Sequence, residues 1–152
     1  MASLLARVYR LIPRPFTRFL LWAVNAKFNF GAVGLFLAPD GRLLVLRHVY
    51  RHKYAWGLPG GYLHRGETPE AGLLRELREE TAMAASITRV LCVEAVDAFQ
   101  KEVVFVGTVD PAQTPRLNHE IYEVAFVPLD ALPEGMLPRH AAIITRYHAS
   151  IR

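Results

Sequence analysis

The chain has 152 residues, which is enough for one domain with a hydrophobic core that needs no cross-links. With 52% hydrophobic and 21% charged residues and no internal repeat, it is neither a disordered nor a fibrous chain. The net charge of +4 favours anionic partners such as nucleotides, nucleic acid or an acidic membrane surface, but it does not choose among them.

The first 27 residues predict an N-terminal helical extension. Residues 3–12 and 15–26 are interpreted as two short helices, separated by Pro13 and Pro15. The uncharged run over residues 19–26 is far too short to span a bilayer. A secretory signal is not expected either, because arginines lie late in this segment and prolines interrupt it.

The extension carries a row of arginines that would share one face of a continuous helix: Arg7, Arg10, Arg14 and Arg18. We expect this face to be solvated, with the apolar cluster at residues 19–22 packed on the domain or on a second subunit, as in a homodimer. The alternative is a basic amphipathic anchor on an anionic membrane, which we do not favour.

Two strands are predicted next, over residues 30–38 and 42–48. They flank Pro39-Asp40-Gly41, which is typical of a turn, so together they predict a hairpin. Residues 49–59 are interpreted as a polar and aromatic loop that ends at a glycine pair.

Residues 68–81 predict a helix. Thr68 is suited to the N-cap, Pro69 to the first helical position, and Glu70 to the positive end of the helix dipole.

The rest of the chain predicts three more strands and a closing helix. The strands span residues 86–98, 102–109 and 120–129, and the helix spans residues 137–151. Strands and helices are mixed along the chain, so we expect a mixed sheet covered by helices. The single cysteine, Cys92, cannot form an internal disulfide, and nothing demands an oxidising compartment; we expect a cytoplasmic protein.

Three glutamates crowd one arc of the helix over residues 68–81: Glu76, Glu79 and Glu80. Glu80 comes seven residues after Leu73, which places it beside the apolar stripe. Like charges on adjacent turns repel one another, and Arg75 reaches only part of the cluster. The arrangement is either a charge-rich surface helix or a site for a hard divalent cation such as Mg²⁺, and the unbalanced charge favours the cation.

The residues before the helix fit a cation site. Gly60 and Gly61 would bring the backbone close to the helix and could offer a carbonyl oxygen as a further ligand. Glu67 could hold the loop to the helix through Arg75.

This spacing resembles a known motif. Gly61, Glu67 and the run Arg75-Glu76-Leu77-Arg78-Glu79-Glu80-Thr81-Ala82-Met83 match the Nudix box, G-x5-E-x7-R-E-U-x-E-E-x-G-U, in which U is aliphatic. The match spans 23 residues and includes every charged position of the motif. Ala82 stands where the family has glycine, so we expect a cost of about 1 kcal/mol or a shifted helix end.

The resemblance implies a fold and a reaction. Nudix domains are α/β/α sandwiches with a mixed sheet, which would occupy residues 28–152 and leave residues 1–27 as the helical extension. Nudix enzymes hydrolyse a nucleoside diphosphate linked to another moiety and use Mg²⁺ or Mn²⁺. A nucleotide-sensing domain without catalysis is the alternative, although the intact glutamate set argues against it.

Roles follow by position in the motif. The resemblance implies that the metal ligands are Glu76, Glu79, Glu80 and the carbonyl of Gly61. It implies that Arg75, paired with Glu67, orients the glutamates. The general base would be Glu79, Glu76 or a carboxylate from a distant loop, for which Glu120 is our preferred candidate.

Substrate selectivity is not readable from the motif. Arg47 and Arg51 precede the glycines and are suited to contact phosphates, and Phe99 is a candidate for stacking on a base. We expect a small nucleotide substrate. Specific nucleic-acid binding is not expected, because no basic stripe interleaved with aromatic residues follows the motif.

Overall fold

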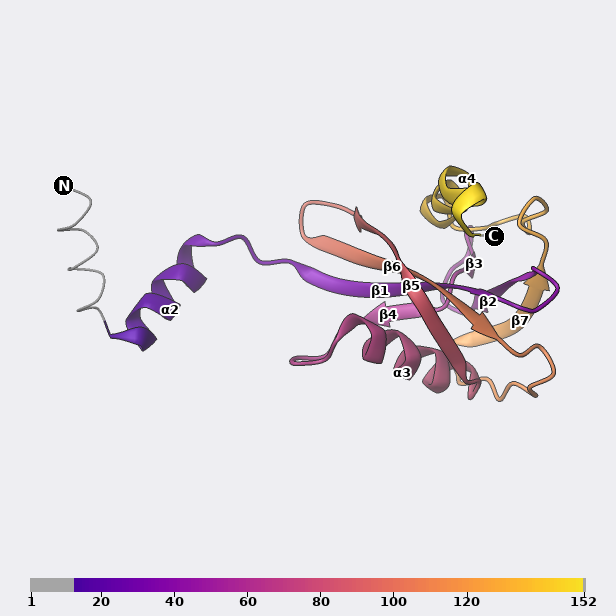
Figure 1. The fold of residues 1–152 in the computed structure, drawn as a ribbon, viewed down its shortest axis with the longest axis horizontal. Coiled ribbons are helices and arrows are strands. Elements are labelled where there is room, and N and C mark those ends of the chain that lie inside the picture. The colour runs from indigo at the N-terminus through magenta and orange to yellow at the C-terminus, as the bar shows by residue number, and fades with distance from the viewer. Residues whose placement is uncertain (1–12, 152) are drawn as a thin grey trace.

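The computed structural model describes residues 13–151, so the predicted helix over residues 3–12 lies outside the described residues. Figure 1 shows an elongated molecule, in which the first described helix stands apart from a layered domain. The elements in chain order are α2 (Arg14–Val24), β1 (Asn29–Leu37), β2 (Leu43–His48), β3 (Trp56–Gly57), β4 (Gly60–Tyr62), α3 (Pro69–Thr81), β5 (Ala85–Ala95), β6 (Gln100–Val109), β7 (Ile121–Val127) and α4 (Pro138–Ile151).

The seven strands form one mixed sheet. Its path runs β3-β2-β1-β6-β5, with β4 paired to β1 and β7 paired to β2. Strand β1 lies parallel to β6 over its whole length and antiparallel to β2 and β4. The prediction of a mixed sheet is therefore confirmed.

Helices α3 and α4 cover opposite faces of the sheet (Figure 1). On one face, Leu73 and Leu77 of α3 pack in a buried cluster with Phe36 of β1. On the other face, Ile144 of α4 packs in a second cluster with Leu35 of β1. Successive side chains of a strand point to opposite faces, so β1 is apolar on both sides because both sides are covered. This is the predicted α/β/α sandwich.

The predicted hairpin forms only at its turn. Strands β1 and β2 pair at Leu37 and Leu43, after which β1 pairs with β4 and β2 pairs with β7. A Cβ atom on Gly60 would lie 2.2 Å from the carbonyl oxygen of Ala32, so glycine is what allows β4 to lie against β1. The region predicted as a loop up to residue 59 therefore contains strand β3 and leads directly into a second short strand.

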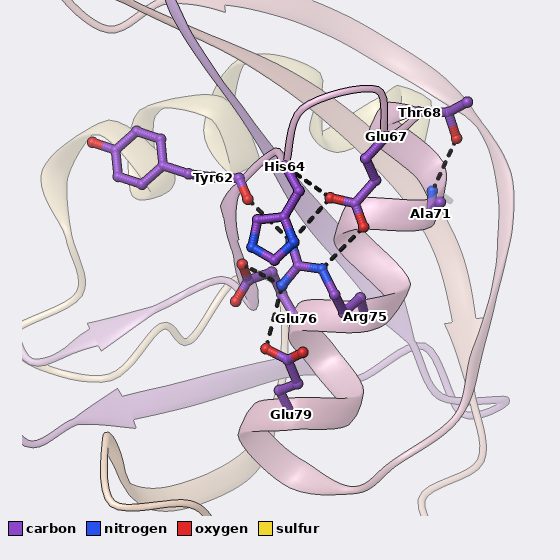
Figure 2. Close-up of polar contacts among 8 residues, drawn as sticks. All are labelled: Tyr62, His64, Glu67, Thr68, Ala71, Arg75, Glu76 and Glu79. Atoms are coloured by element: carbon purple, nitrogen blue, oxygen red, sulfur yellow. Dashed lines mark hydrogen bonds and ion pairs between the residues drawn. The ribbon is translucent and has the colours of Figure 1, made fainter.

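Helix α3 begins and ends as its sequence predicts. The Thr68 hydroxyl accepts a hydrogen bond of 3.2 Å from the backbone N–H of Ala71 at the N-terminus (Figure 2). At the C-terminus, Ala82 adopts the left-handed conformation, with φ 58°. The helix end is thus not shifted, and alanine takes the backbone conformation that favours glycine.

Helix α2 corrects one part of an expectation. None of its residues is buried, so the apolar cluster at residues 19–22 does not pack on the domain, while packing on a second subunit stays a prediction. Within residues 13–151, no helix is both long and apolar enough to cross a membrane.

Candidate active site

A cavity of about 440 Å³ lies where α3, the glycine-rich strand β4, β6 and the start of α4 meet. Charged side chains of both signs line it. The acidic ones are Glu76, Glu80, Glu102 and Glu120, and the basic ones are Arg51 and Arg139. Such a cavity can hold a ligand that carries both a cation and negatively charged oxygens.

Arg75 clamps the loop before α3 to the helix. Its Nε donates to Glu67 Oε1 at 2.9 Å and its Nη2 to Glu67 Oε2 at 3.1 Å (Figure 2). Nη2 also donates to the backbone carbonyl of Tyr62 at 3.1 Å. The hydrogen bonds from Arg75 lower the pKa of the Glu67 carboxyl to about 2, so Glu67 stays ionised.

The same guanidinium orients two of the helix glutamates. Arg75 Nη1 lies 2.9 Å from Glu76 Oε1 and 3.3 Å from Glu79 Oε2 (Figure 2). A Cβ atom on Gly61 would lie 2.5 Å from the carboxylate carbon of Glu76, so this carboxylate rests directly against the glycine backbone. The predicted contact between the glycine segment and the acidic helix is therefore present.

Glu80 is buried without full compensation. Glu80 is only 4% exposed, and its Oε2 has no hydrogen-bond partner among the described residues. Burial raises the pKa of the Glu80 carboxyl to about 8, and the nearby charges of Glu76 and Glu120 add to the effect. A buried, orphaned carboxylate beside two others is the arrangement that a cation would stabilise.

The oxygen atoms of these side chains are the type of ligand that Mg²⁺ prefers. Within residues 13–151, no three acidic, histidine or cysteine side chains are already gathered into a closed cage. Mg²⁺ does not require one, because it keeps several waters and is usually bound by one or two carboxylates together with substrate phosphates. The carboxylates of Glu76 and Glu80, with the backbone at Gly61, therefore fit this ion.

Five predicted site residues do not line the cavity. Two of them, Glu67 and Arg75, form the clamp described above. Glu79 has a side chain that is 57% exposed and is held by Arg75. Arg47 pairs with Glu123 at 3.5 Å, and Phe99 is 73% exposed.

The structure adds site residues that the sequence interpretation missed. Glu102, on β6, is buried and receives a hydrogen bond of 3.3 Å from Arg139 Nη2, while its Oε2 has no partner among the described residues. Burial raises the pKa of Glu102. A glutamate among the apolar residues of strand β6 was the signal that could have revealed it.

Three histidines also line the cavity, and two of them, His48 and His140, have shifted pKa values. His140 Nδ1 accepts a hydrogen bond of 2.9 Å from the backbone N–H of Leu58, so the neutral ring carries its proton on Nε2. Burial lowers the pKa of His140 to about 3 and that of His48 to about 4. His48 is thus a neutral, half-buried group of the site.

Comparisons with known proteins agree with this geometry. The family model described as the NUDIX domain matches residues 27–147. The structure resembles the crystal structure of a MutT NUDIX hydrolase from Burkholderia pseudomallei, with a TM-score of 0.64 and 25% identity, over 78% of this chain and 97% of that one.

Two curated relatives match over shorter stretches. An ADP-ribose pyrophosphatase of Mycobacterium tuberculosis is 40% identical over 67 residues, which are 41% of this chain and 32% of the relative. An RNA pyrophosphohydrolase of Acinetobacter baylyi is 46% identical over 52 residues, which are 34% of this chain and 30% of the relative. The matched stretch thus spans about a third of each relative.

Proposed function

Because the chain belongs to the Nudix family, we propose that it is a Mg²⁺-dependent hydrolase that cleaves the pyrophosphate bond of a nucleoside diphosphate linked to another moiety. The observation that carries this proposal is the buried carboxylate of Glu80, which has an orphaned oxygen and lies near Glu76 and Glu120 in a cavity that also contains two arginines. The names of the relatives, ADP-ribose pyrophosphatase and RNA pyrophosphohydrolase, support a pyrophosphate as the common substrate feature.

Glu76, Glu80 and the carbonyl of Gly61 would hold the ion, with Glu79 as a fourth ligand from its place in the motif. The bound ion would supply positive charge against phosphate oxygens and would make a water molecule more acidic. Arg75 holds Glu76 and Glu79, and Glu67 holds Arg75. This chain of contacts fixes the acidic side chains before substrate arrives, so little reorganisation is needed during the reaction.

Glu120 is our choice for the proton acceptor. It lines the cavity, and among the described residues it has no arginine or lysine partner; only His119 lies near, at 3.8 Å. Glu76 also lines the cavity, but Arg75 engages one of its oxygens. A carboxylate that no arginine engages keeps its oxygens available to a water molecule in the cavity, which favours Glu120 as the base.

Arg51 would bind the phosphates of the substrate. Its Nη1 is buried without a hydrogen-bond partner among the described residues. A Cβ atom on Gly57 would lie 2.7 Å from that nitrogen, so the guanidinium packs on the backbone of β3. Arg139 Nε is buried without such a partner as well. Anionic oxygens in the cavity would satisfy both groups by charge-assisted hydrogen bonds.

The deciding experiment is a substrate panel with and without Mg²⁺. Nucleoside triphosphates, nucleotide sugars and dinucleotides are incubated with the full chain, and released phosphate and nucleotide products are measured. We expect one class to be hydrolysed only with Mg²⁺. Glu80→Gln and Glu76→Gln should abolish turnover, while Glu70→Gln, an exposed residue at the start of the same helix, should not.

A nucleotide-sensing domain is the alternative function. Its signature would be an inert panel in the presence of Mg²⁺ and Mn²⁺, together with one nucleotide that raises the melting temperature. That result would reject the hydrolase.

A further inference from the structure

Helix α2 presents an apolar surface that nothing in the described part of the chain covers. Its large apolar side chains are mostly exposed, and none of its residues is buried. Figure 1 shows the helix projecting from the sandwich at the end of a short linker. Exposed apolar surface of this kind marks an interaction site, because leaving it in water is unfavourable.

The helix is amphipathic. At about 100° per residue, Phe16, Phe19 and Leu20 share one face. Arg14 and Arg18 lie on the opposite face, which also holds Leu21. Trp22 falls between the two faces. An apolar face with phenylalanine and leucine, a basic opposite face and a tryptophan at the boundary are typical of helices that lie in a membrane interface.

Charge identifies the partner. The first 28 residues contain five basic side chains and no acidic one, and the first acidic residue of the chain is Asp40. A surface of this charge is complementary to anionic lipid headgroups. A second copy docked through the same helix would bring like charges together, so the charge pattern opposes self-association.

The surface continues onto the end of the domain nearest α2. Phe28 follows the helix, and Lys101 of β6 lies 4.9 Å from the centre of its ring. The backbone N–H of Asn29 donates to the carbonyl of Phe99 at 2.7 Å, which places the exposed Phe99 beside the start of β1. The neighbouring Gln100 lines the cavity. Docking of this end would therefore bring the rim of the cavity close to the headgroups.

Because α2 does not pack on the domain, we reverse the preference drawn from the sequence and propose that α2, together with Phe28 and Phe99, docks the protein on an anionic lipid surface, with the helix in the plane of the interface. Phe16, Phe19 and Leu20 insert among the acyl chains, and Arg14 and Arg18 contact the headgroups. The proposal does not depend on the hydrolase activity, because it rests on the exposure and charge of the N-terminal segment.

The test is sedimentation of the full chain with vesicles of phosphatidylcholine alone and with vesicles that contain one quarter phosphatidylglycerol. We expect at least a tenfold larger bound fraction with the anionic vesicles, and a decrease of that fraction at high salt. Fluorescence gives a second readout: emission should shift to the blue on binding, and Trp22→Phe should remove most of the shift.

Two variants locate the contact. Phe19→Glu/Leu20→Glu should abolish binding, and Arg14→Gln/Arg18→Gln should remove the preference for anionic vesicles. The matched control is Val90→Glu/Val93→Glu, which adds the same charge at two exposed positions of β5 and should bind as the wild type does. Since α2 has no buried residue, the circular dichroism melting temperature should not change in the helix variants.

Three results would overturn the proposal. The first is no sedimentation with either vesicle. The second is equal binding to both vesicles, unaffected by Arg14→Gln/Arg18→Gln. The third is a dimer in sedimentation velocity that Phe19→Glu/Leu20→Glu dissociates, which would assign the face to a second copy of the chain.

Discussion

His140, in the first turn of α4, accepts a hydrogen bond from the backbone N–H of Leu58, at 2.9 Å. The bond joins the last helix to the segment just before the glycine pair. It also sets the position of the neighbouring Arg139, which reaches Glu102 on β6 at 3.3 Å. One side wall of the cavity is therefore held by contacts between residues far apart in the sequence.

Removing this imidazole should destabilise the fold. His140→Ala leaves the buried N–H of Leu58 without an acceptor, which costs about 1–3 kcal/mol. Urea denaturation of the full chain measures the loss. The control is His64→Ala, since His64 is exposed and its side chain makes no hydrogen bond within residues 13–151. Equal effects of the two substitutions would contradict a structural role for His140.

The raised pKa of Glu80 predicts how stability depends on pH without divalent cations. The carboxyl has a pKa of about 8 in the folded protein and about 4.5 when unfolded, so between these values the folded state binds the extra proton. The free energy of unfolding should therefore fall as pH rises through this window, by at most roughly 1.4 kcal/mol per pH unit.

The range from about pH 7.5 to 8.5 best separates this effect from the buried histidines. His48 and His140 have lowered pKa values in the folded protein, and unfolded histidines titrate near pH 6.5, so both residues are nearly neutral in both states only in this higher range. Urea denaturation at several pH values should show the decline in the wild type and a weaker one in Glu80→Gln. Saturating Mg²⁺ should also flatten it, because the ion favours the ionised carboxylate. A wild-type slope identical to that of Glu80→Gln would refute the assignment.

Replacing Arg75 by lysine should release Glu67. Lysine keeps the charge but lacks the fork that contacts both oxygens of this carboxylate. The pKa of Glu67 should rise from about 2 toward 4.5, as followed by carboxyl NMR titration. Because the pKa of Glu67 is lowered in the folded protein, the ionised carboxylate stabilises the fold above its unfolded pKa, and this contribution disappears as pH falls through the folded pKa. The folded pKa is higher in the variant, so the variant should lose this stability at a higher pH than the wild type. Arg78→Lys, at an exposed position of α3, should change neither property.

Ala82→Gly should stabilise the protein by about 1 kcal/mol. Among residues 13–151, Ala82 is the non-glycine residue with positive φ, and glycine adopts this conformation without the Cβ penalty. The midpoint of urea unfolding should rise. Ala84→Gly is the matched control: its φ is not positive, so glycine there only adds freedom to the unfolded chain and should not stabilise.

Glu120→Gln should separate catalysis from binding. If Glu120 accepts the proton, kcat falls by about 10²-fold or more while KM changes little. Steady-state kinetics on the substrate found in the panel measures both constants. Glu123→Gln removes a nearby carboxylate that pairs with Arg47 outside the cavity and should leave kcat unchanged. An unchanged kcat in Glu120→Gln would refute this role and would leave the base among the other carboxylates of the motif.

The sequence by itself determined helix α3 and its acidic arc. Thr68 as a cap, the leucine spacing and the crowded glutamates are all local, because hydrogen bonds and side-chain neighbours within a helix connect residues at most a few positions apart. The ion pair between Arg75 and Glu79 is local as well, because the two residues are four positions apart in the helix. Helical periodicity also gave the amphipathic pattern of residues 15–26.

Tertiary structure alone decided which distant groups meet. Glu102 and Arg139 enter the cavity from β6 and α4, and nothing near them in the sequence indicates that contact. Strands β1 and β2 pair only near their turn because β4 pairs with β1 and β7 pairs with β2. Likewise, the apolar face of α2 is exposed because no part of the domain packs against it. Such pairings are set by the packing of whole layers, which no short stretch of residues encodes.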